Sequence, residues 1–227
     1  TMGAQRDGAF SEYITMPIER IYDGKGLNPK QLALIEPFCI SYHGVSRADV
    51  KKGDKVLVIG AGTIGVLAAI AAKAKGGEVY IVDVAEEKLQ YAYETFGLAG
   101  MIKNDSEEEF MNRVNEITRE HHGFDVCIEA VGLPSTFQNC IDAAAYGGRI
   151  VLIGVGKKNL DFNFTLIQKK ELNIFGSRNA LKADFTELID LVKNGEIDLE
   201  KIVMNPDSTD VKKKSEYELD EADRAFE

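Results

Sequence analysis

The sequence predicts an α/β fold, in which a doubly wound sheet of parallel strands carries helices between its strands. Short apolar runs recur along the chain, and stretches with the 3.6-residue periodicity of amphipathic helices separate them. The run at residues 56–59 (Val-Leu-Val-Ile) is apolar throughout, as expected of a strand that is buried on both faces. Strands and helices that alternate in this way form a parallel sheet with right-handed crossover connections.

Six strands can be placed along the chain by this pattern. We expect them at residues 56–59, 78–82, 100–103, 124–129, 149–153 and 172–175. The helices are expected at about residues 64–75 and 86–96, after Ser106, after Pro134 and at residues 184–193. Ser106 and Glu109 have the spacing of a capping box, which would start the helix that follows them. Six strands of this kind indicate the order 3-2-1-4-5-6.

Further elements are expected on either side of this sheet. Residues 8–15 alternate between apolar and polar side chains roughly as a half-buried strand does. Asn28 and Pro29 are typical of the N-cap and the first position of a helix. Pro37 interrupts the apolar pattern that follows, so we expect two short helices or one kinked helix there. Residues 219–227 also have a helical pattern.

Composition excludes several classes of protein. The formal net charge of the 227 residues is −10, which argues against a general nucleic-acid binder. No apolar run reaches the length of about 18 residues that a membrane span needs, so we expect no membrane partner. The cysteines, at positions 39, 127 and 140, are widely spaced and form no C-x-x-C motif. They suit a reducing compartment, and we expect the protein to be cytoplasmic.

A glycine-rich turn follows the first strand of the sheet. Gly60, Gly62 and Gly65 fit the pattern G-x-G-x-x-G, and an alanine-rich helix comes next. We expect the first glycine to allow the tight turn and the last to let the helix pack closely on the strand. Gly62 has no Cβ, so a pyrophosphate could approach the backbone, and the amides around Thr63 to Gly65 would face it at the positive end of the helix.

An acidic residue stands where such a motif requires one. Asp83 ends the second strand, 21 residues after Gly62, and its carboxylate would accept hydrogen bonds from both ribose hydroxyls of a dinucleotide. The same carboxylate would repel a 2′-phosphate, which favours NAD over NADP as the cofactor. The alternative is a strand-helix-strand unit with an incidental acid, which the motif and its context disfavour.

Several segments together resemble the zinc-containing medium-chain alcohol and polyol dehydrogenases, such as the sorbitol and threonine dehydrogenases. They are residues 7–13 (Asp-Gly-Ala-Phe-Ser-Glu-Tyr), Glu36-Pro37, residues 50–62, residues 129–132 (Glu-Ala-Val-Gly) and residues 176–179 (Gly-Ser-Arg-Asn). The family's catalytic Cys, its G-H-E segment and its structural zinc lobe have no match in this chain. We therefore expect a fragment that consists of the coenzyme domain and stubs of the catalytic domain.

The resemblance implies a division of the chain into three parts. Residues 1–28 would be the tail of a GroES-like catalytic domain, and residues 29–180 a Rossmann domain that binds NAD. Residues 181–227 would form the last Rossmann helix and the start of the return to the catalytic domain.

The resemblance also implies roles for individual residues. Ile64 would back the nicotinamide ring, and Lys88 would lie near the adenosine ribose. Residues after the fourth strand would flank the adenosine, and those after the fifth would meet the nicotinamide amide: Ala130, Val131, Gly132, Ile153 and Gly154. The alternative for Lys88 is a solvated helix residue, and for the others ordinary packing at strand ends.

A zinc role is implied for Glu36, because Glu36-Pro37 resembles the Glu-Pro of polyol dehydrogenases. A carboxylate can complete a zinc shell or hold the zinc-bound water. The alternative for Glu36 is a helix acid that the dipole favours. Cys39 is the rival ligand, and a free cysteine is more often simply buried. His43 could be a relay base or a residue at a helix C-terminus, which we favour, and Arg178 could bind a substrate oxygen or a nearby acid.

The expected activity is hydride transfer from a secondary alcohol, such as a polyol or a sugar acid, to NAD with the assistance of zinc. The remaining zinc ligands and the catalytic residues are not identified in this chain, so the fragment alone would be inactive. One alternative is an NAD-binding module without catalysis, and another is a zinc-free quinone or enoyl reductase. The family also pairs the strand expected at residues 172–175 with its copy, which implies a homodimer or homotetramer.

Overall fold

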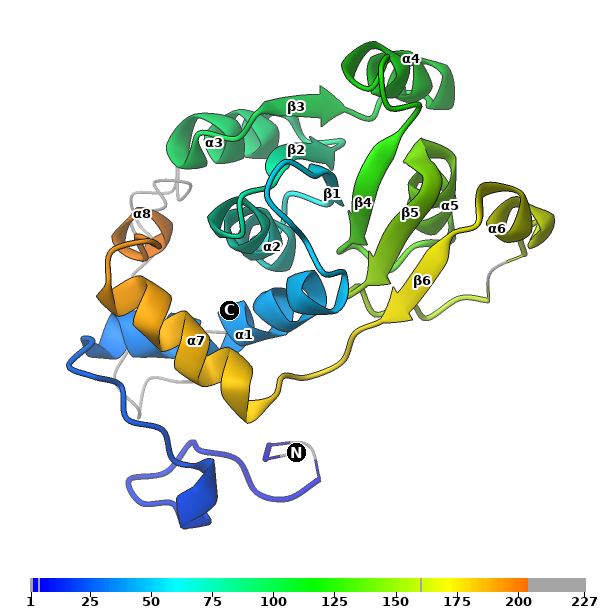
Figure 1. Ribbon diagram of the computed structural model, residues 1–227. Coiled ribbons are helices and arrows are strands. Elements are labelled where there is room, and N and C mark those ends of the chain that lie inside the picture. Colours follow the sequence, from blue (N-terminus) through cyan, green and yellow to red (C-terminus); the bar gives the residue numbers. More distant parts are fainter. Residues whose placement is uncertain (1, 4, 160, 204–227) are drawn as a thin grey trace.

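A computed structural model of the chain describes residues 2–3, 5–159 and 161–203, and these form a single parallel sheet with flanking helices (Figure 1). The strands lie in the order β3-β2-β1-β4-β5-β6, and every neighbouring pair is parallel. Their bounds are β1 (Lys55–Ile59), β2 (Glu78–Asp83), β3 (Gly100–Lys103), β4 (Phe124–Glu129), β5 (Ala144–Leu152) and β6 (Asn173–Gly176). This confirms the doubly wound α/β fold and the predicted strand order.

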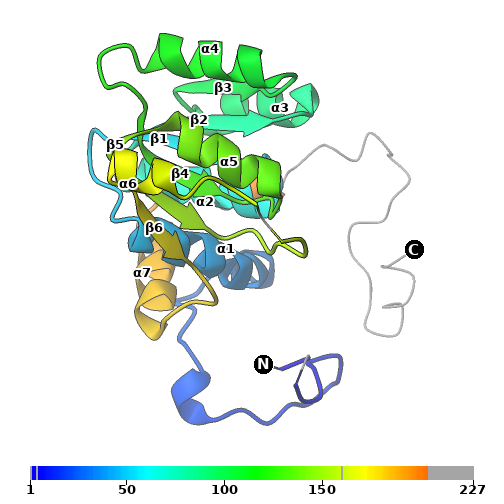
Figure 2. The same ribbon diagram turned by 90° about the vertical axis from the view of Figure 1, so that its right-hand side faces the viewer.

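Helices cover both faces of this sheet, as the two views in Figures 1 and 2 show. One face carries α1 (Pro29–Arg47), α2 (Thr63–Ala74), α3 (Glu86–Phe96) and α7 (Lys182–Lys193). The other carries α4 (Glu107–Ile117), α5 (Pro134–Ala143) and α6 (Thr165–Lys170). The short elements η1 (Ile18–Arg20) and α8 (Glu200–Val203) complete the described part of the chain. None of the described helices is both long and apolar enough to span a bilayer.

The apolar run in β1 explains why the core has two layers. Val56 and Val58 belong to the cluster beneath α1 and α2, whereas Leu57 and Ile59 belong to the cluster beneath α4 and α5. Successive side chains of a strand point to opposite faces, so a strand with helices on both sides is apolar at every position. Each of these four side chains is at most 2% exposed.

One prediction before β1 is wrong. Residues 8–15 form no strand, and Phe10 and Tyr13 are 73% and 89% exposed. A strand needs a partner, and no strand among the described residues lies beside this segment. The structure also decides between the two alternatives at Pro37, because α1 is one helix that runs through this residue. Packing against both α2 and α7 compensates for the hydrogen bond that the proline cannot donate.

Several element boundaries differ from the predictions by a few residues. The strand β5 begins at Ala144, earlier than expected, and α7 begins at Lys182. The helix α6 was not predicted. The Ser106 cap is confirmed, because its hydroxyl accepts the Glu109 amide at 3.2 Å. The helix expected at residues 219–227 lies outside the described residues.

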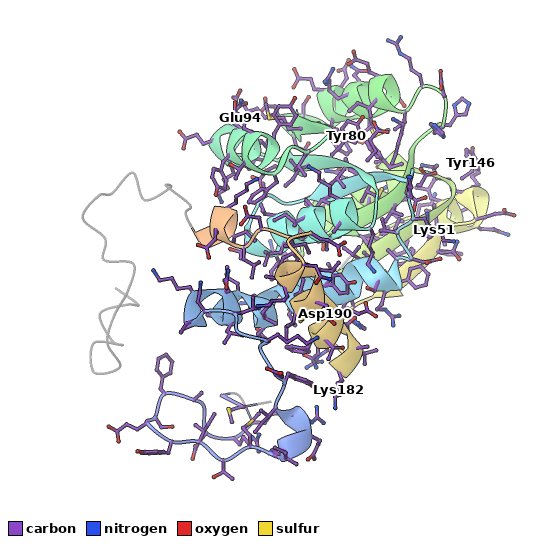
Figure 3. All side chains as sticks on the ribbon, turned by 60° about the vertical axis from the view of Figure 1, so that its left-hand side comes forward. Lys51, Tyr80, Glu94, Tyr146, Lys182 and Asp190 are labelled. Carbon is purple, nitrogen blue, oxygen red and sulfur yellow. The ribbon has the colours of Figure 1, made fainter. Side chains whose placement is uncertain are left out.

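The segment before α1 contacts α7 through Tyr22 and Lys25. Lys25 pairs with Asp190, which Figure 3 labels on α7, and Tyr22 stacks on Phe185 of the same helix with ring centroids 4.8 Å apart. The helix α1 therefore lies between α2 on one side and α7 on the other. Through Ser41 and Gly44, α1 also contacts Ile64 and Ile153 at the carboxyl edge of the sheet.

Candidate coenzyme site

The glycine-rich turn after β1 has the geometry that its sequence predicts at two positions. Gly60 has φ 110°, a conformation that favours glycine, and a Cβ there would lie 2.7 Å from Cγ2 of Val131. A Cβ on Gly65 would lie 1.8 Å from the carbonyl oxygen of Gly60. Both glycines are therefore required by the packing of the protein itself, the first for the turn and the second for the close approach of α2.

The protein's own packing does not require a glycine at position 62. Gly62 has φ −77° and ψ 178°, which suit any residue, and a Cβ there would meet nothing within 4 Å. It is the N-cap of α2 and supplies no side-chain acceptor to the first helical amides. Gly62 and Thr63 are exposed. The helix thus presents amides and the positive end of its dipole to an open space, as an anion site requires.

Asp83 lies at the end of β2 and holds this turn in place. Its Oδ2 accepts the Ala61 amide at 2.7 Å, and its Oδ1 accepts the Ala85 amide at 2.9 Å. Each carboxylate oxygen has a second lone pair, so the half-buried group can still accept hydroxyl donors. Sequence reasoning foresaw an acid near the turn but missed that its carboxylate also supports the turn.

Lys88 reaches the same region from α3. It is exposed and lines a cavity of about 380 Å³ together with Gly62, Thr63 and Tyr91. The structure therefore brings a cation beside the open helix end, where a phosphate or a ribose could meet it.

The segments after β4 and β5 complete this edge of the sheet. A Cβ on Gly154 would lie 2.3 Å from the amide nitrogen of Gly132, so the two segments touch. Ala130 and Val131 lie against Gly60, and Val131 is still 42% exposed. Three loops that are far apart in sequence thus meet where ligands bind in doubly wound sheets.

The helix α1 backs the predicted nicotinamide end. The hydroxyl of the buried Ser41 donates to the carbonyl oxygen of Ile64 at 2.7 Å. A Cβ on Gly44 would lie 2.5 Å from Cδ1 of Ile153. Ile64 and Ile153 therefore have fixed positions relative to one helix, although they come from different parts of the sheet.

The two candidate zinc ligands, Glu36 and Cys39, have different surroundings. Glu36 is exposed and lines cavities of about 1130 Å³ and 940 Å³ beside the segment that contains Arg6. Cys39 is 0% exposed, and burial, followed by the charges of Asp184 and Glu36, raises the pKa of its thiol to about 12. Among the described residues, no three His, Cys, Asp or Glu side chains could hold a metal ion together. The residues present do not fit a complete zinc site.

His43 lies inside α1 and not at its end, which corrects the favoured prediction. Its Nδ1 is 2.9 Å from Oδ2 of Asp184, and that oxygen also accepts the Leu181 amide at 2.6 Å. The pair links α1 to the start of α7. Arg178, after β6, is exposed.

Two buried acids were missed by sequence reasoning, Glu129 and Asp184, which are 2% and 6% exposed. The signal for Glu129 was available, because it ends an otherwise apolar strand. Asp184 lies in an ordinary amphipathic helix, and only its contact with His43 sets it apart.

Comparison with known proteins agrees with this geometry. A family model described as zinc-binding dehydrogenase matches residues 63–194. L-galactonate-5-dehydrogenase of Escherichia coli (strain K12) is 35% identical over 199 residues, which cover 86% of this chain and 57% of that protein.

Two solved structures have a similar fold. One is described as a short-chain alcohol dehydrogenase from Escherichia coli CFT073, complexed with NADH, with 28% identity and a TM-score of 0.79 over 88% of this chain and 58% of that chain. The other is described as a putative zinc-binding dehydrogenase from Sinorhizobium meliloti 1021, bound to NADP, with 26% identity and a TM-score of 0.79 over 88% and 59%. This chain spans somewhat more than half the length of these relatives. The chain belongs to the zinc-binding dehydrogenase family.

Proposed function

We propose that this chain binds the nicotinamide coenzyme of an oxidoreductase that interconverts a secondary alcohol and a ketone. The observation that carries the proposal is the open space at Gly62, in front of a helix end that no side chain caps. A pyrophosphate there would accept hydrogen bonds from the first amides of α2, and Lys88 would add a positive charge.

The preferred coenzyme in this proposal is NAD. The Asp83 carboxylate is held by the amides of Ala61 and Ala85, so it cannot easily turn away from the ribose position. Both oxygens keep acceptor capacity for the ribose hydroxyls, and a 2′-phosphate would bring like charge against them. A solved relative binds NADP, so the choice between the coenzymes has to be tested on this chain.

The remaining segments would orient the coenzyme. Ala130, Val131 and Gly132 would flank the adenosine, and Ile153 and Gly154 would meet the nicotinamide amide. Ile64 would limit the position of the ring from behind, because Ser41 holds its backbone. When bound, the coenzyme would supply the group that accepts hydride from the alcohol.

The substrate class proposed is a polyol or a sugar acid, in line with the L-galactonate dehydrogenase among the relatives. Glu36 is kept as a candidate zinc ligand, and the described residues offer it no second and third ligand. The division of the chain at residues 28 and 180 is also a proposal, and α1 begins at Pro29.

Calorimetric titration of the chain with NAD and with NADP tests the proposal. We expect NAD to bind about tenfold or more tightly than NADP, because a like charge beside a half-buried carboxylate costs about 1.4 kcal/mol or more. Asp83→Ser should reduce that preference, since serine keeps a short acceptor for the Ala61 amide but no charge. Equal affinities of the parent chain would refute the choice of NAD, and binding of neither coenzyme would refute the function.

A further inference from the structure

A buried carboxylate supports the loops of the candidate coenzyme site. Glu129 ends β4 and is 2% exposed. Its Oε1 accepts the Val131 amide at 2.9 Å, the Gly132 amide at 2.8 Å and the Thr136 hydroxyl at 2.7 Å. A carboxylate removed from water is stable only with such partners, so these bonds account for its burial.

The Thr136 hydroxyl lies within hydrogen-bond distance of two acceptors. Its Oγ1 is 2.7 Å from Oε1 of Glu129 and 2.9 Å from the carbonyl oxygen of Leu133. A hydroxyl donates one hydrogen bond, and the shorter contact to a charged acceptor is the stronger one. Thr136 lies in the first turn of α5, so the same carboxylate attaches the start of α5 to the end of β4.

The amides that Glu129 holds belong to a turn in contact with the other two loops of the site. Val131 packs against Gly60, where a Cβ would come within 2.7 Å of its Cγ2. A Cβ on Gly132 would lie 2.7 Å from the carbonyl carbon of Val155, in the segment after β5. The turn at residues 131–132 is thus packed between the glycine-rich turn and the segment after β5.

The second carboxylate oxygen of Glu129, Oε2, lies next to the segment after β5. A Cβ on Gly154 would lie 2.6 Å from Oε2 of Glu129. The backbone amides of Ile153 and Gly154 also donate to the main-chain carbonyl of Glu129, at 2.9 Å and 3.1 Å. One residue therefore contacts the segments after β4 and β5, and reaches the glycine-rich turn through Val131.

We propose that Glu129 is a positioning residue for the coenzyme, which sets the distance between the turn that meets the pyrophosphate and the segments that meet the two nucleosides. The inference rests on the proposed function, because it deepens the role of the same site. Glu129 would not contact the coenzyme itself. It acts through the amides of Val131 and Gly132, which would otherwise lack an acceptor and let the turn move away from Gly60.

A merely structural role makes a different prediction. If Glu129 only stabilised the fold, its removal would lower stability as any core truncation does, and coenzyme affinity of the folded fraction would stay the same. If Glu129 positions the turn, its removal lowers the affinity for the coenzyme by more than the loss of stability explains. A side chain that keeps an acceptor oxygen at this position then restores the affinity.

The experiment compares three variants of the whole chain. Glu129→Gln keeps an oxygen that can accept the two amides, Glu129→Ala removes it, and Val114→Ala truncates a side chain of α4 that is 1% exposed and takes no part in the candidate coenzyme site. Urea unfolding measures the stability of each variant, and calorimetry measures its dissociation constant for NAD. Hydrogen exchange followed by NMR reports on the amides of Val131 and Gly132 without coenzyme.

We expect Glu129→Ala to bind NAD about tenfold or more weakly than the parent chain, since two partly buried amides lose a charged acceptor. Its two turn amides should exchange about tenfold or more faster, relative to the amides of β1 in the same variant. Glu129→Gln should stay within about threefold of the parent in affinity, and Val114→Ala should lose stability but keep its affinity.

The outcomes separate the two proposals. Unchanged affinity in Glu129→Ala, or a loss equal to that in Val114→Ala, overturns the positioning role, as do turn amides that exchange no faster than in the parent. If the parent binds neither NAD nor NADP, the proposed function fails. The exchange of the two amides then still decides whether Glu129 holds the turn.

Discussion

Replacement of Gly62 by alanine should weaken coenzyme binding and leave the fold intact. Gly62 adopts φ −77° and ψ 178°, which alanine adopts without strain, and the added methyl group would meet no protein atom within 4 Å. The methyl group would instead project into the space where we place the pyrophosphate. A substitution at Gly62 therefore tests coenzyme binding separately from the stability of the fold.

Two opposing effects set the expected stability of Gly62→Ala. Alanine restricts the unfolded chain more than glycine does, which stabilises the folded state by about 0.4–1 kcal/mol. Alanine is also a poorer N-cap than glycine, which costs about 0.5–1 kcal/mol. The net change in the free energy of unfolding should therefore stay within about 1 kcal/mol.

The expected loss of binding is larger. A methyl group between the backbone and the pyrophosphate would lengthen at least one hydrogen bond from an amide to a charged oxygen. A bond of that kind contributes about 1.5–3 kcal/mol, so NAD should bind about ten- to hundredfold more weakly.

Gly65→Ala is the matched control, because its Cβ would lie 1.8 Å from the carbonyl oxygen of Gly60. Overpacking against backbone costs about 1–3 kcal/mol or more, so this variant should lose stability in urea unfolding. Calorimetry with NAD and urea unfolding on both variants complete the test. An affinity of Gly62→Ala within about twofold of the parent, with the fold intact, would refute the placement of the pyrophosphate.

Three further predictions concern the pH dependence of stability, a helix cap and assembly. Burial raises the pKa of Cys39 from 9.0 to about 12, so the folded state keeps this proton when the unfolded chain has lost it. Stability should therefore fall as pH rises from about 9 to about 12, and urea unfolding of Cys39→Ala should show a shallower fall. Asn28 and Gln31 form a capping box at the start of α1, with bonds of 2.9 Å and 3.0 Å. Asn28→Ala should lower the free energy of unfolding by about 1 kcal/mol, and no change in thermal or urea unfolding would contradict that role. We propose that β6, an edge strand of the sheet, pairs with its copy in a dimer, so light scattering at micromolar concentration should give at least twice the mass of one chain, and a monomer would exclude this pairing.

The sequence predicted most of the sheet because its signals are local. The apolar run in β1, the helix periodicities and the capping residues depend on neighbours along the chain, and all were located to within a few residues. The glycine pattern was an equally good predictor, since Gly60 and Gly65 have the packing roles that their spacing predicts. Local signals were not enough where distant contacts decide. They left open whether α1 is one helix or two, and they predicted a strand at residues 8–15, which find no partner strand among the described residues.

The sequence by itself determined the α/β class, the strand order and the position of a turn suited to a dinucleotide. Periodicity, glycine spacing and an acid at the end of the second strand are enough for that, because each reflects the steric and hydrogen-bonding needs of one short segment. Only the tertiary structure showed that Gly62 alone of the three glycines faces open space, and that Asp83 and Glu129 hold the loops of the site through backbone amides. The physical reason is that the role of each carboxylate depends on its hydrogen-bond partners, and those partners are known only once the strands lie side by side.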